Sequence, residues 1–310
     1  MEMRPFGKTG FETSALGFGG GPVGFDAPEQ QAVVRILNML LDRGVNLIDT
    51  AAAYKGSEEA IGKAVGHRRD EYVLVSKCGL GIEGIEGDPW SAPAITATVE
   101  RALKRLQTDR LDVMLLHSCE LDVLKRGEAI EALVKARDAG KIRRLGYSGD
   151  NDAAVWAANH PEVAVIETSV NICDQANIDA LLPETRARKI GVLAKRPIAN
   201  GAWRRTGEIS PFYLNYSRDY AARLESMGIA PGDLGFDDDP DSVWPEIALR
   251  FTLAQPGVTT AIVGTTKESH LEANLAAAAK GPLPAAAVDA LRAAFQKAEA
   301  ASGESWPGLR

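Results

Sequence analysis

Four polar residues stand at the ends of successive strand-like runs, and together they could donate a proton to a carbonyl group. The apolar run 45–48 is followed by Asp49 and Tyr54, the run that begins at 72 ends in Lys77, and the run 111–116 ends in His117. Strands that converge on one face of a barrel carry catalytic groups at such ends. A tyrosine beside a lysine, an aspartate and a histidine is a plausible proton donor, so we expect these four residues to form one site.

The elements that would position these residues alternate along almost the whole chain. Apolar runs typical of buried strands lie at 14–18, 45–48, 72–75, 111–116, 143–147, 163–166, 190–194 and 258–263. Helical periodicity is found at 30–42, 57–65, 91–106, 121–139, 152–159, 177–188, 244–254 and 267–279. Eight alternations of strand and helix favour a (β/α)8 TIM barrel over a doubly wound sheet.

Three segments lie outside this repeat. Residues 1–13 precede the first strand and contain a hairpin turn at 7–10, and residues 284–300 form an extra C-terminal helix. Residues 201–242 are predicted to be a long loop over the catalytic face, because loops of this length are usually lids or binding loops. No linker divides the chain, so we expect residues 1–310 to form a single domain.

Composition indicates a globular protein of the cytoplasm. The chain has 45% hydrophobic and 25% charged residues, and its formal net charge of −7 argues against nucleic acid as a partner. We expect no membrane association, because no apolar run approaches the roughly 20 residues of a membrane span, and the N-terminus lacks the apolar core of a signal peptide. The three cysteines, Cys78, Cys119 and Cys173, are too few for a disulfide framework and match no zinc spacing, so we predict no metal site.

A set of motifs in this order resembles the aldo-keto reductase superfamily over nearly the whole chain. The matching stretches are 7–10 with 14–19, 46–54 with the Ser-Glu pair at 57–58, 103–109, 111–117 and 264–274. The resemblance implies a barrel enzyme that uses a nicotinamide cofactor to reduce aldehydes and ketones. It also implies that Tyr54 is the general acid, assisted by Asp49, Lys77 and His117. The physics agrees, because an unperturbed tyrosine has a pKa of about 10 and a neighbouring ammonium lowers it.

The resemblance further implies the cofactor contacts. These are Ser148, Glu167, Lys195, Arg196, Pro197 and Gly201 around the nicotinamide side, and Gly264, Thr265, Thr266, Lys267, His270 and Asn274 around the phosphates and adenine. Lys267 and His270 could bind a 2′-phosphate, which favours NADP over NAD, with NAD remaining possible.

Several positions depart from the family pattern. Gly149 stands where an asparagine is common, Glu167 where a glutamine contacts the carboxamide, and Lys195 where an aromatic ring stacks on the nicotinamide. In the cofactor motif, His270 replaces a common arginine and Ala273 a common glutamate. We expect Lys195 and Glu167 to form an ion pair that replaces the usual contacts.

The expected reaction is hydride transfer between NAD(P)H and the carbonyl of an aldehyde, a ketone or a sugar, the small-molecule partner of the site. Two other functions remain open at this point. Lys77 could form a Schiff base in an aldolase-like barrel, or the chain could be a cofactor-binding or sensing barrel with little turnover. The substrate, the reaction direction and the oligomeric state do not follow from the sequence.

Overall fold

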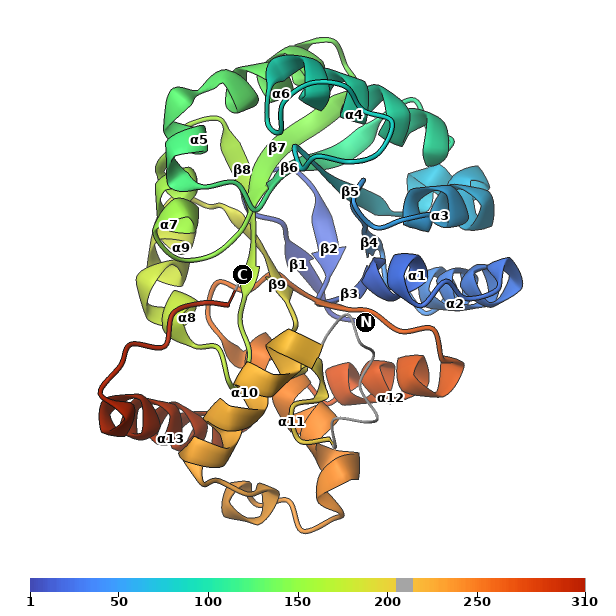
Figure 1. Ribbon diagram of the computed structural model, residues 1–310. Coiled ribbons are helices and arrows are strands. Elements are labelled where there is room, and N and C mark those ends of the chain that lie inside the picture. Colours follow the sequence, from blue (N-terminus) through green and yellow to red (C-terminus); the bar gives the residue numbers. More distant parts are fainter. Residues whose placement is uncertain (205–213, 310) are drawn as a thin grey trace.

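The computed structural model describes residues 1–204 and 214–309 (Figure 1). Within them, eight parallel strands close into a barrel in the order β10, β3, β4, β5, β6, β7, β8, β9, which confirms the predicted (β/α)8 fold. The strands are β3 (Leu16–Gly19), β4 (Leu47–Asp49), β5 (Val73–Cys78), β6 (Leu111–His117), β7 (Ile142–Ser148), β8 (Val163–Ser169), β9 (Gly191–Lys195) and β10 (Thr260–Val263). Each strand pairs with the next one along the chain, and the last pairs with the first.

An N-terminal hairpin closes one end of the barrel. It consists of β1 (Met3–Pro5) and β2 (Glu12–Ser14), which pair antiparallel. Phe6, directly after β1, is completely buried and joins the apolar side chains inside the barrel. A Cβ atom at Gly191 would lie 2.4 Å from the Phe6 ring, so only glycine leaves room for this plug.

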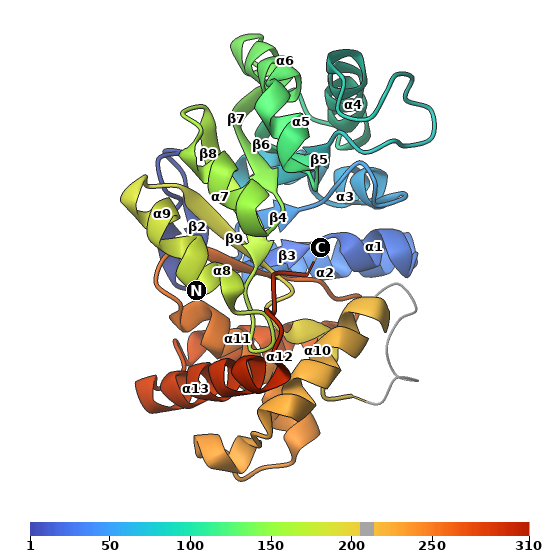
Figure 2. The same ribbon diagram turned by 60° about the vertical axis from the view of Figure 1, so that its left-hand side comes forward.

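The helices form an outer layer around the strands (Figures 1 and 2). They are α1 (Gly21–Phe25), α2 (Gln30–Asp42), α3 (Ser57–Val65), α4 (Ala92–Arg105), α5 (Leu121–Arg126), α6 (Glu128–Asp138), α7 (Asn151–Asn159), α8 (Ala176–Ala180), α9 (Leu182–Ala187), α10 (Leu214–Met227), α11 (Pro240–Ala254), α12 (Glu268–Ala279) and α13 (Ala285–Ser302), with 3-10 turns η1 (Gly66–Glu71), η2 (Ala199–Gly201) and η5 (Pro231–Leu234). No helix in the described part of the chain is both long enough and apolar enough to span a membrane.

Some helix predictions need correction. The predicted helix 121–139 is two helices, α5 and α6, because Gly127 adopts a left-handed conformation with φ 80° between them. The predicted helix 177–188 is likewise divided into α8 and α9. The helix predicted at 244–254 begins earlier, at Pro240, and α1 was not predicted at all.

The segment 201–242, expected to be a long loop, contains the helix α10. Tyr220, Leu224 and Met227 recur at helical spacing and are buried in the same apolar cluster as Leu291 and Phe295 of α13. Burial of this apolar stripe against the predicted extra C-terminal helix explains why the segment is helical. Residues 205–213 of the segment lie outside the described residues.

Candidate active site

The side chains inside the barrel change from apolar to polar at the carboxyl end of the strands. In five strands an interior apolar residue is followed two positions later by a polar one: Asp49 after Leu47, Lys77 after Val75, His117 after Leu115, Glu167 after Val165 and Lys195 after Leu193. Residues two apart point to the same face of a strand, so these polar side chains all face the barrel mouth. Catalytic residues of such barrels lie at this end.

Lys77 is completely buried and contacts two carboxylates. Its Nζ lies 2.6 Å from both oxygens of Asp49 and 3.1 Å from Glu167 Oε2, and it donates a third hydrogen bond to the Thr50 carbonyl at 3.1 Å. Burial opposes the charged form, but Asp49 and Glu167 outweigh it and raise the pKa of Lys77. The side chain is therefore an ammonium ion at neutral pH.

Tyr54 lies on the turn between β4 and α3, with its ring beside Lys77. The Lys77 Nζ is 5.3 Å from the centre of the Tyr54 ring. The ring also meets His117 edge-on at 6.0 Å and Phe25 at 5.2 Å between centres. The backbone N–H of Tyr54 donates to the Ala51 carbonyl at 3.0 Å, which fixes the turn. The structure thus brings together all four residues that the sequence predicted.

Tyr54 and His117 are both uncharged at neutral pH. Burial raises the pKa of Tyr54 to about 12, and the Lys77 ammonium offsets only part of this rise. Burial, together with the positive charges of Lys77 and Lys195, lowers the pKa of His117 to about 3. A protonated phenol and a neutral imidazole can each donate one hydrogen bond to a substrate oxygen in the mouth.

The predicted ion pair between Lys195 and Glu167 is wrong. Lys195 Nζ lies 2.8 Å from Asp150 Oδ2, while Glu167 contacts Lys77. Asp150 is completely buried, and its other oxygen accepts the Ser169 N–H at 2.7 Å. Burial alone would raise the pKa of Asp150, but Lys195 and the Ser169 N–H bring it below its ordinary value. Sequence analysis assigned no role to Asp150, which follows the predicted strand 143–147 by three positions.

Ser148 and Glu167 are register partners on the neighbouring strands β7 and β8. Both side chains are buried at the barrel mouth. The next residue, Gly149, donates its N–H to the Glu167 carbonyl at 2.9 Å. A Cβ atom at Gly149 would lie 2.3 Å from the Tyr147 hydroxyl, which donates a hydrogen bond to the Cys119 carbonyl. This packing explains the glycine at a position where the family often has asparagine.

The predicted phosphate contacts lie on the connection from β10 into α12. Lys267 is exposed, His270 is half-buried, and the pKa of His270 is lowered by burial and then by the charges of Lys267 and Arg204. Arg204 therefore joins a basic group that sequence analysis assigned to Lys267 and His270 only. Its position within 201–242 gave no signal for this contact. The other predicted contacts here are Gly264, the buried Thr265, Thr266 and the buried Asn274.

The predicted contacts Arg196, Pro197 and Gly201 follow β9. Arg196 Nη1 donates to the Leu309 carbonyl at 2.7 Å, and its guanidinium lies 3.8 Å from the centre of the Tyr216 ring. The Pro197 carbonyl accepts a hydrogen bond from Thr252. The structure therefore places Arg196 against the C-terminal segment, and a role in cofactor binding stays a prediction.

The C-terminal segment 304–309 returns from α13 to the barrel mouth (Figure 2). Gly308 and the side chain of Asn151 exchange two hydrogen bonds, of 2.8 and 3.0 Å. The Leu309 N–H donates to Asp174 at 3.0 Å. Burial, followed by the charge of Asp150, raises the pKa of Asp174 to about 7. Sequence analysis gave no role to this segment, which hydrogen-bonds to residues that follow β7, β8 and β9.

The basic group near the start of α12 fits a ligand that carries an anionic group such as a phosphate. Buried atoms without a hydrogen-bond partner among the described residues include Asp174 Oδ1 and Asn200 Nδ2. Such atoms are rare in native proteins unless a ligand or water binds them. Near the start of α12, the basic group of Arg204, Lys267 and His270 suits an anion. The described residues contain no group of three or more metal-ligating side chains.

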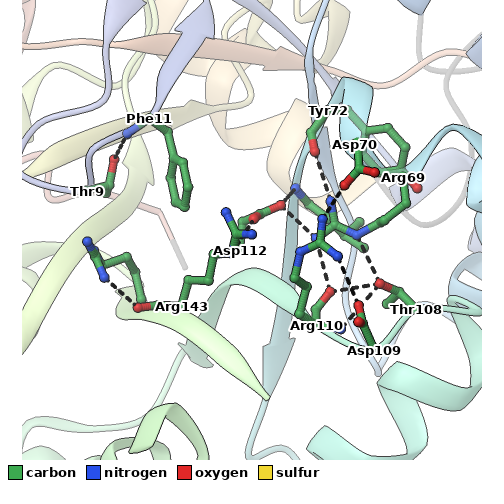
Figure 3. Close-up of polar contacts among 12 residues, drawn as sticks. Thr9, Phe11, Arg69, Asp70, Tyr72, Thr108, Asp109, Arg110, Asp112 and Arg143 are labelled. Atoms are coloured by element: carbon green, nitrogen blue, oxygen red, sulfur yellow. Dashed lines mark hydrogen bonds and ion pairs between the residues drawn. The ribbon is translucent and has the colours of Figure 1, made fainter. Parts of the chain in front are cut away.

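A cavity of about 210 Å³ lies at the opposite end of the barrel, between the hairpin and the strand beginnings (Figure 3). Its charged side chains neutralise one another: Arg69 binds Asp112 at 2.7 Å, and Arg110 pairs with Asp70 and Asp109. The Asp112 carboxylate also accepts the Leu74 N–H of β5 at 2.9 Å. This network connects β5 and β6 to the 3-10 turn η1. Such contacts have the stabilising role that is expected at the amino end of a barrel of this kind.

Fold and site together define a barrel enzyme with its polar centre at the carboxyl ends of the strands. Residues 15–295 match the Aldo/keto reductase family, and the chain belongs to that family. This confirms the predicted resemblance, and with it the class of a nicotinamide-dependent oxidoreductase.

Relatives cover most of the chain. An L-galactose dehydrogenase of Arabidopsis thaliana is 28% identical over 296 residues, which are 89% of this chain and 88% of that protein. An NADH-specific methylglyoxal reductase of Escherichia coli is 27% identical and covers 89% of this chain and 93% of its own length. The solved structure of an aldo-keto reductase from Bacillus halodurans in its holo form has 28% identity and a TM-score of 0.78, covering 95% of this chain and 96% of that one.

Proposed function

We propose that the chain transfers a hydride between NAD(P)H and the carbonyl carbon of an aldehyde, a ketone or a sugar. The observation that carries this proposal is the placement of the Tyr54 ring against both the Lys77 ammonium and the His117 ring at the barrel mouth. The cofactor supplies the hydride, and the barrel supplies position and protons. The names of two relatives, a sugar dehydrogenase and a methylglyoxal reductase, agree with this substrate range.

The residues of the mouth have complementary roles in this reaction. Negative charge develops on the substrate oxygen as the carbonyl is reduced, and the neutral Tyr54 and His117 can donate hydrogen bonds to it. Tyr54 then gives up its proton, and the Lys77 ammonium stabilises the phenolate that remains. Asp49 holds Lys77 in place through two contacts of 2.6 Å.

The state of Lys77 argues against a Schiff-base mechanism. A lysine nucleophile must lose its proton and reach the substrate. Lys77 is completely buried, contacts two carboxylates and has a raised pKa, so the neutral amine is strongly disfavoured. We therefore favour the role of a charged neighbour to Tyr54.

We favour NADP(H) as the cofactor. A 2′-phosphate carries close to two negative charges, and the basic group of Arg204, Lys267 and His270 lies near the start of α12. Charge-assisted hydrogen bonds to such a phosphate contribute roughly 1.5–3 kcal/mol. One relative is named NADH-specific, so a preference for NADH occurs among proteins similar to this chain.

The test is an assay of NADPH and NADH oxidation against a panel of aldehydes, ketones and sugars, with Tyr54→Phe as the matched variant. We expect substrate-dependent oxidation by the wild type and a loss of about two orders of magnitude or more in kcat in Tyr54→Phe, the scale of a positioned general acid. Cofactor affinity should hardly change. Full activity of Tyr54→Phe would show that Tyr54 is not the general acid. Cofactor binding by the wild type without turnover of any substrate would favour a sensing role.

A further inference from the structure

Glu167 gives the buried lysine of the site a second carboxylate. Lys77 Nζ lies 2.6 Å from both oxygens of Asp49 and 3.1 Å from Glu167 Oε2. The three side chains are at most 3% exposed. One ammonium thus faces two acidic groups in a region that water does not screen.

The two other cations nearby, Lys195 and Arg196, have other partners. Lys195, which also faces the mouth, pairs with Asp150 at 2.8 Å. Arg196 donates to the Leu309 carbonyl and lies over the Tyr216 ring. Burial and then the charge of Glu167 raise the pKa of Asp49, which is the mark of two carboxylates that repel each other. A positive charge placed beside this cluster would relieve that repulsion.

We propose that Glu167 is a positioning residue that contacts Lys77 in addition to Asp49 and adds a negative charge to the Asp49–Lys77–Glu167 cluster, which favours the oxidised nicotinamide over the reduced one. The oxidised ring carries a positive charge, and the reduced ring is neutral. Glu167 is the register partner of Ser148, so its charge lies beside the part of the mouth where the ring is expected. This inference rests on the proposed function, which places a nicotinamide there.

The test is calorimetric titration of the protein with the oxidised and the reduced form of the cofactor, without any substrate. Glu167→Gln keeps the size of the side chain and removes the charge. We expect the ratio of the Kd of the oxidised form to that of the reduced form to rise about tenfold, the effect of losing one nearby charge in a medium of intermediate dielectric constant. Glu167→Asp keeps the charge and should leave the ratio close to that of the wild type.

Glu58→Gln is the matched control. Glu58 is also a buried carboxylate, but it binds Ser76 at 2.8 Å and has no contact with Lys77. Its substitution should leave the ratio unchanged. Glu167→Ala, with the same loss of charge, replaces Glu167→Gln should that variant not fold, and its ratio is expected to rise equally.

The inference is overturned if the ratio in the folded charge-removing variant stays within twofold of the wild type, or if Glu58→Gln changes it as much. It is also overturned if the wild type binds neither form, in which case the proposed function fails with it. Binding of both forms with a ratio that depends on Glu167, but without turnover on any carbonyl, would uphold the inference and refute the proposed function.

Discussion

At the scale of single residues, the barrel mouth widens the pH range over which its titratable groups keep the protonation states that they have at neutral pH. Burial leaves Tyr54 protonated, with a pKa of about 12, and His117 neutral, with a pKa of about 3. Lys77 keeps its charge, because Asp49 and Glu167 both contact its ammonium group. The site thus places two neutral donors beside the Lys77 ammonium.

The neutral state of His117 predicts a loss of stability in acid. Between its ordinary pKa of 6.5 and its folded value of about 3, the unfolded chain binds more protons than the folded one. The free energy of unfolding therefore falls as pH drops below 6.5, by at most about 1.4 kcal/mol per pH unit from this group. Urea unfolding measures the free energy of unfolding at pH 7.5 and at pH 5. The difference between these two values should be smaller in His117→Gln than in the wild type.

The control for this prediction is the exposed His67. His67→Gln should retain the full difference between the two pH values. An equal difference in the wild type and in His117→Gln would mean that His117 accepts its proton in the folded protein.

At the scale of elements, α3 connects the site to the outer layer. The hydroxyl of Ser57, at the start of α3, is hydrogen-bonded at 2.8 Å to the hydroxyl of Thr50, the residue that follows Asp49 in the chain. Gly62 in its middle lets the helix approach the end of α4: a Cβ atom there would lie 2.3 Å from the Arg105 carbonyl oxygen. The position of the strand-end loop that carries Tyr54 thus depends on close packing between two helices.

Gly62→Ala should destabilise the protein, because the carbonyl oxygen at 2.3 Å cannot move without displacing α4. We expect a fall of about 1–3 kcal/mol in the free energy of unfolding, the usual range for overpacking. Gly66→Ala is the matched control, since Gly66 has φ −55° and its nearest neighbour would be 3.5 Å away. Urea unfolding measures the free energy of unfolding of both variants. An equal fall in Gly62→Ala and Gly66→Ala would contradict the prediction.

The start of α12 should set the cofactor preference. Lys267→Ala removes one exposed charge of the basic group, and we expect the preference for NADPH over NADH to shrink by roughly tenfold or less. Lys280→Ala, at the other end of α12 and paired with Glu246, should change nothing. Titration of each variant with NADPH and with NADH measures this preference, which should weaken in high salt. NADH binding that equals NADPH binding in the wild type would show that this basic face is merely solvated.

At the scale of the whole molecule, the C-terminal segment connects the last helix to the barrel mouth. Arg196 after β9, Asn151 in α7 and Asp174 after β8 each bind its backbone, and Arg223 of α10 binds the Pro307 carbonyl at 3.0 Å. Elements that are distant in sequence therefore share one short peptide as a common partner (Figure 2). The closed barrel itself does not depend on it, because β10 pairs directly with β3.

Asn151→Ala should loosen the C-terminal segment without unfolding the barrel. Two hydrogen bonds to Gly308 are lost, each with a net contribution of about 1 kcal/mol. We expect faster limited proteolysis between α13 and the chain end, detected by mass spectrometry, and a raised KM. Asn159→Ala, in the same helix but exposed and bonded only within it, is the control. Equal cleavage rates in the two variants would show that Asn151 does not hold the segment.

The sequence by itself determined the barrel and the four residues at its centre. The strand runs are apolar because both faces of each strand are buried, and the polar residue at each carboxyl end interrupts that run, so strand position and candidate site are the same local signal. Asp49, Tyr54, Lys77 and His117 could be predicted for this reason, since each lies at or just after such an end. The helix boundaries were less certain where a single residue such as Gly127 divides one periodic pattern into two.

Only the tertiary structure decided how the charges pair. Glu167 lies in β8, Lys195 ends β9 and Asp150 follows β7, and nothing local distinguishes a contact of Glu167 with Lys195 from its contact with Lys77. The choice depends on which side chains the closed barrel directs to the same point, which is set by strand register around the whole ring. The helix α10 and the C-terminal segment are fixed in the same way, because their partners lie far away in the chain and become neighbours only when the barrel closes.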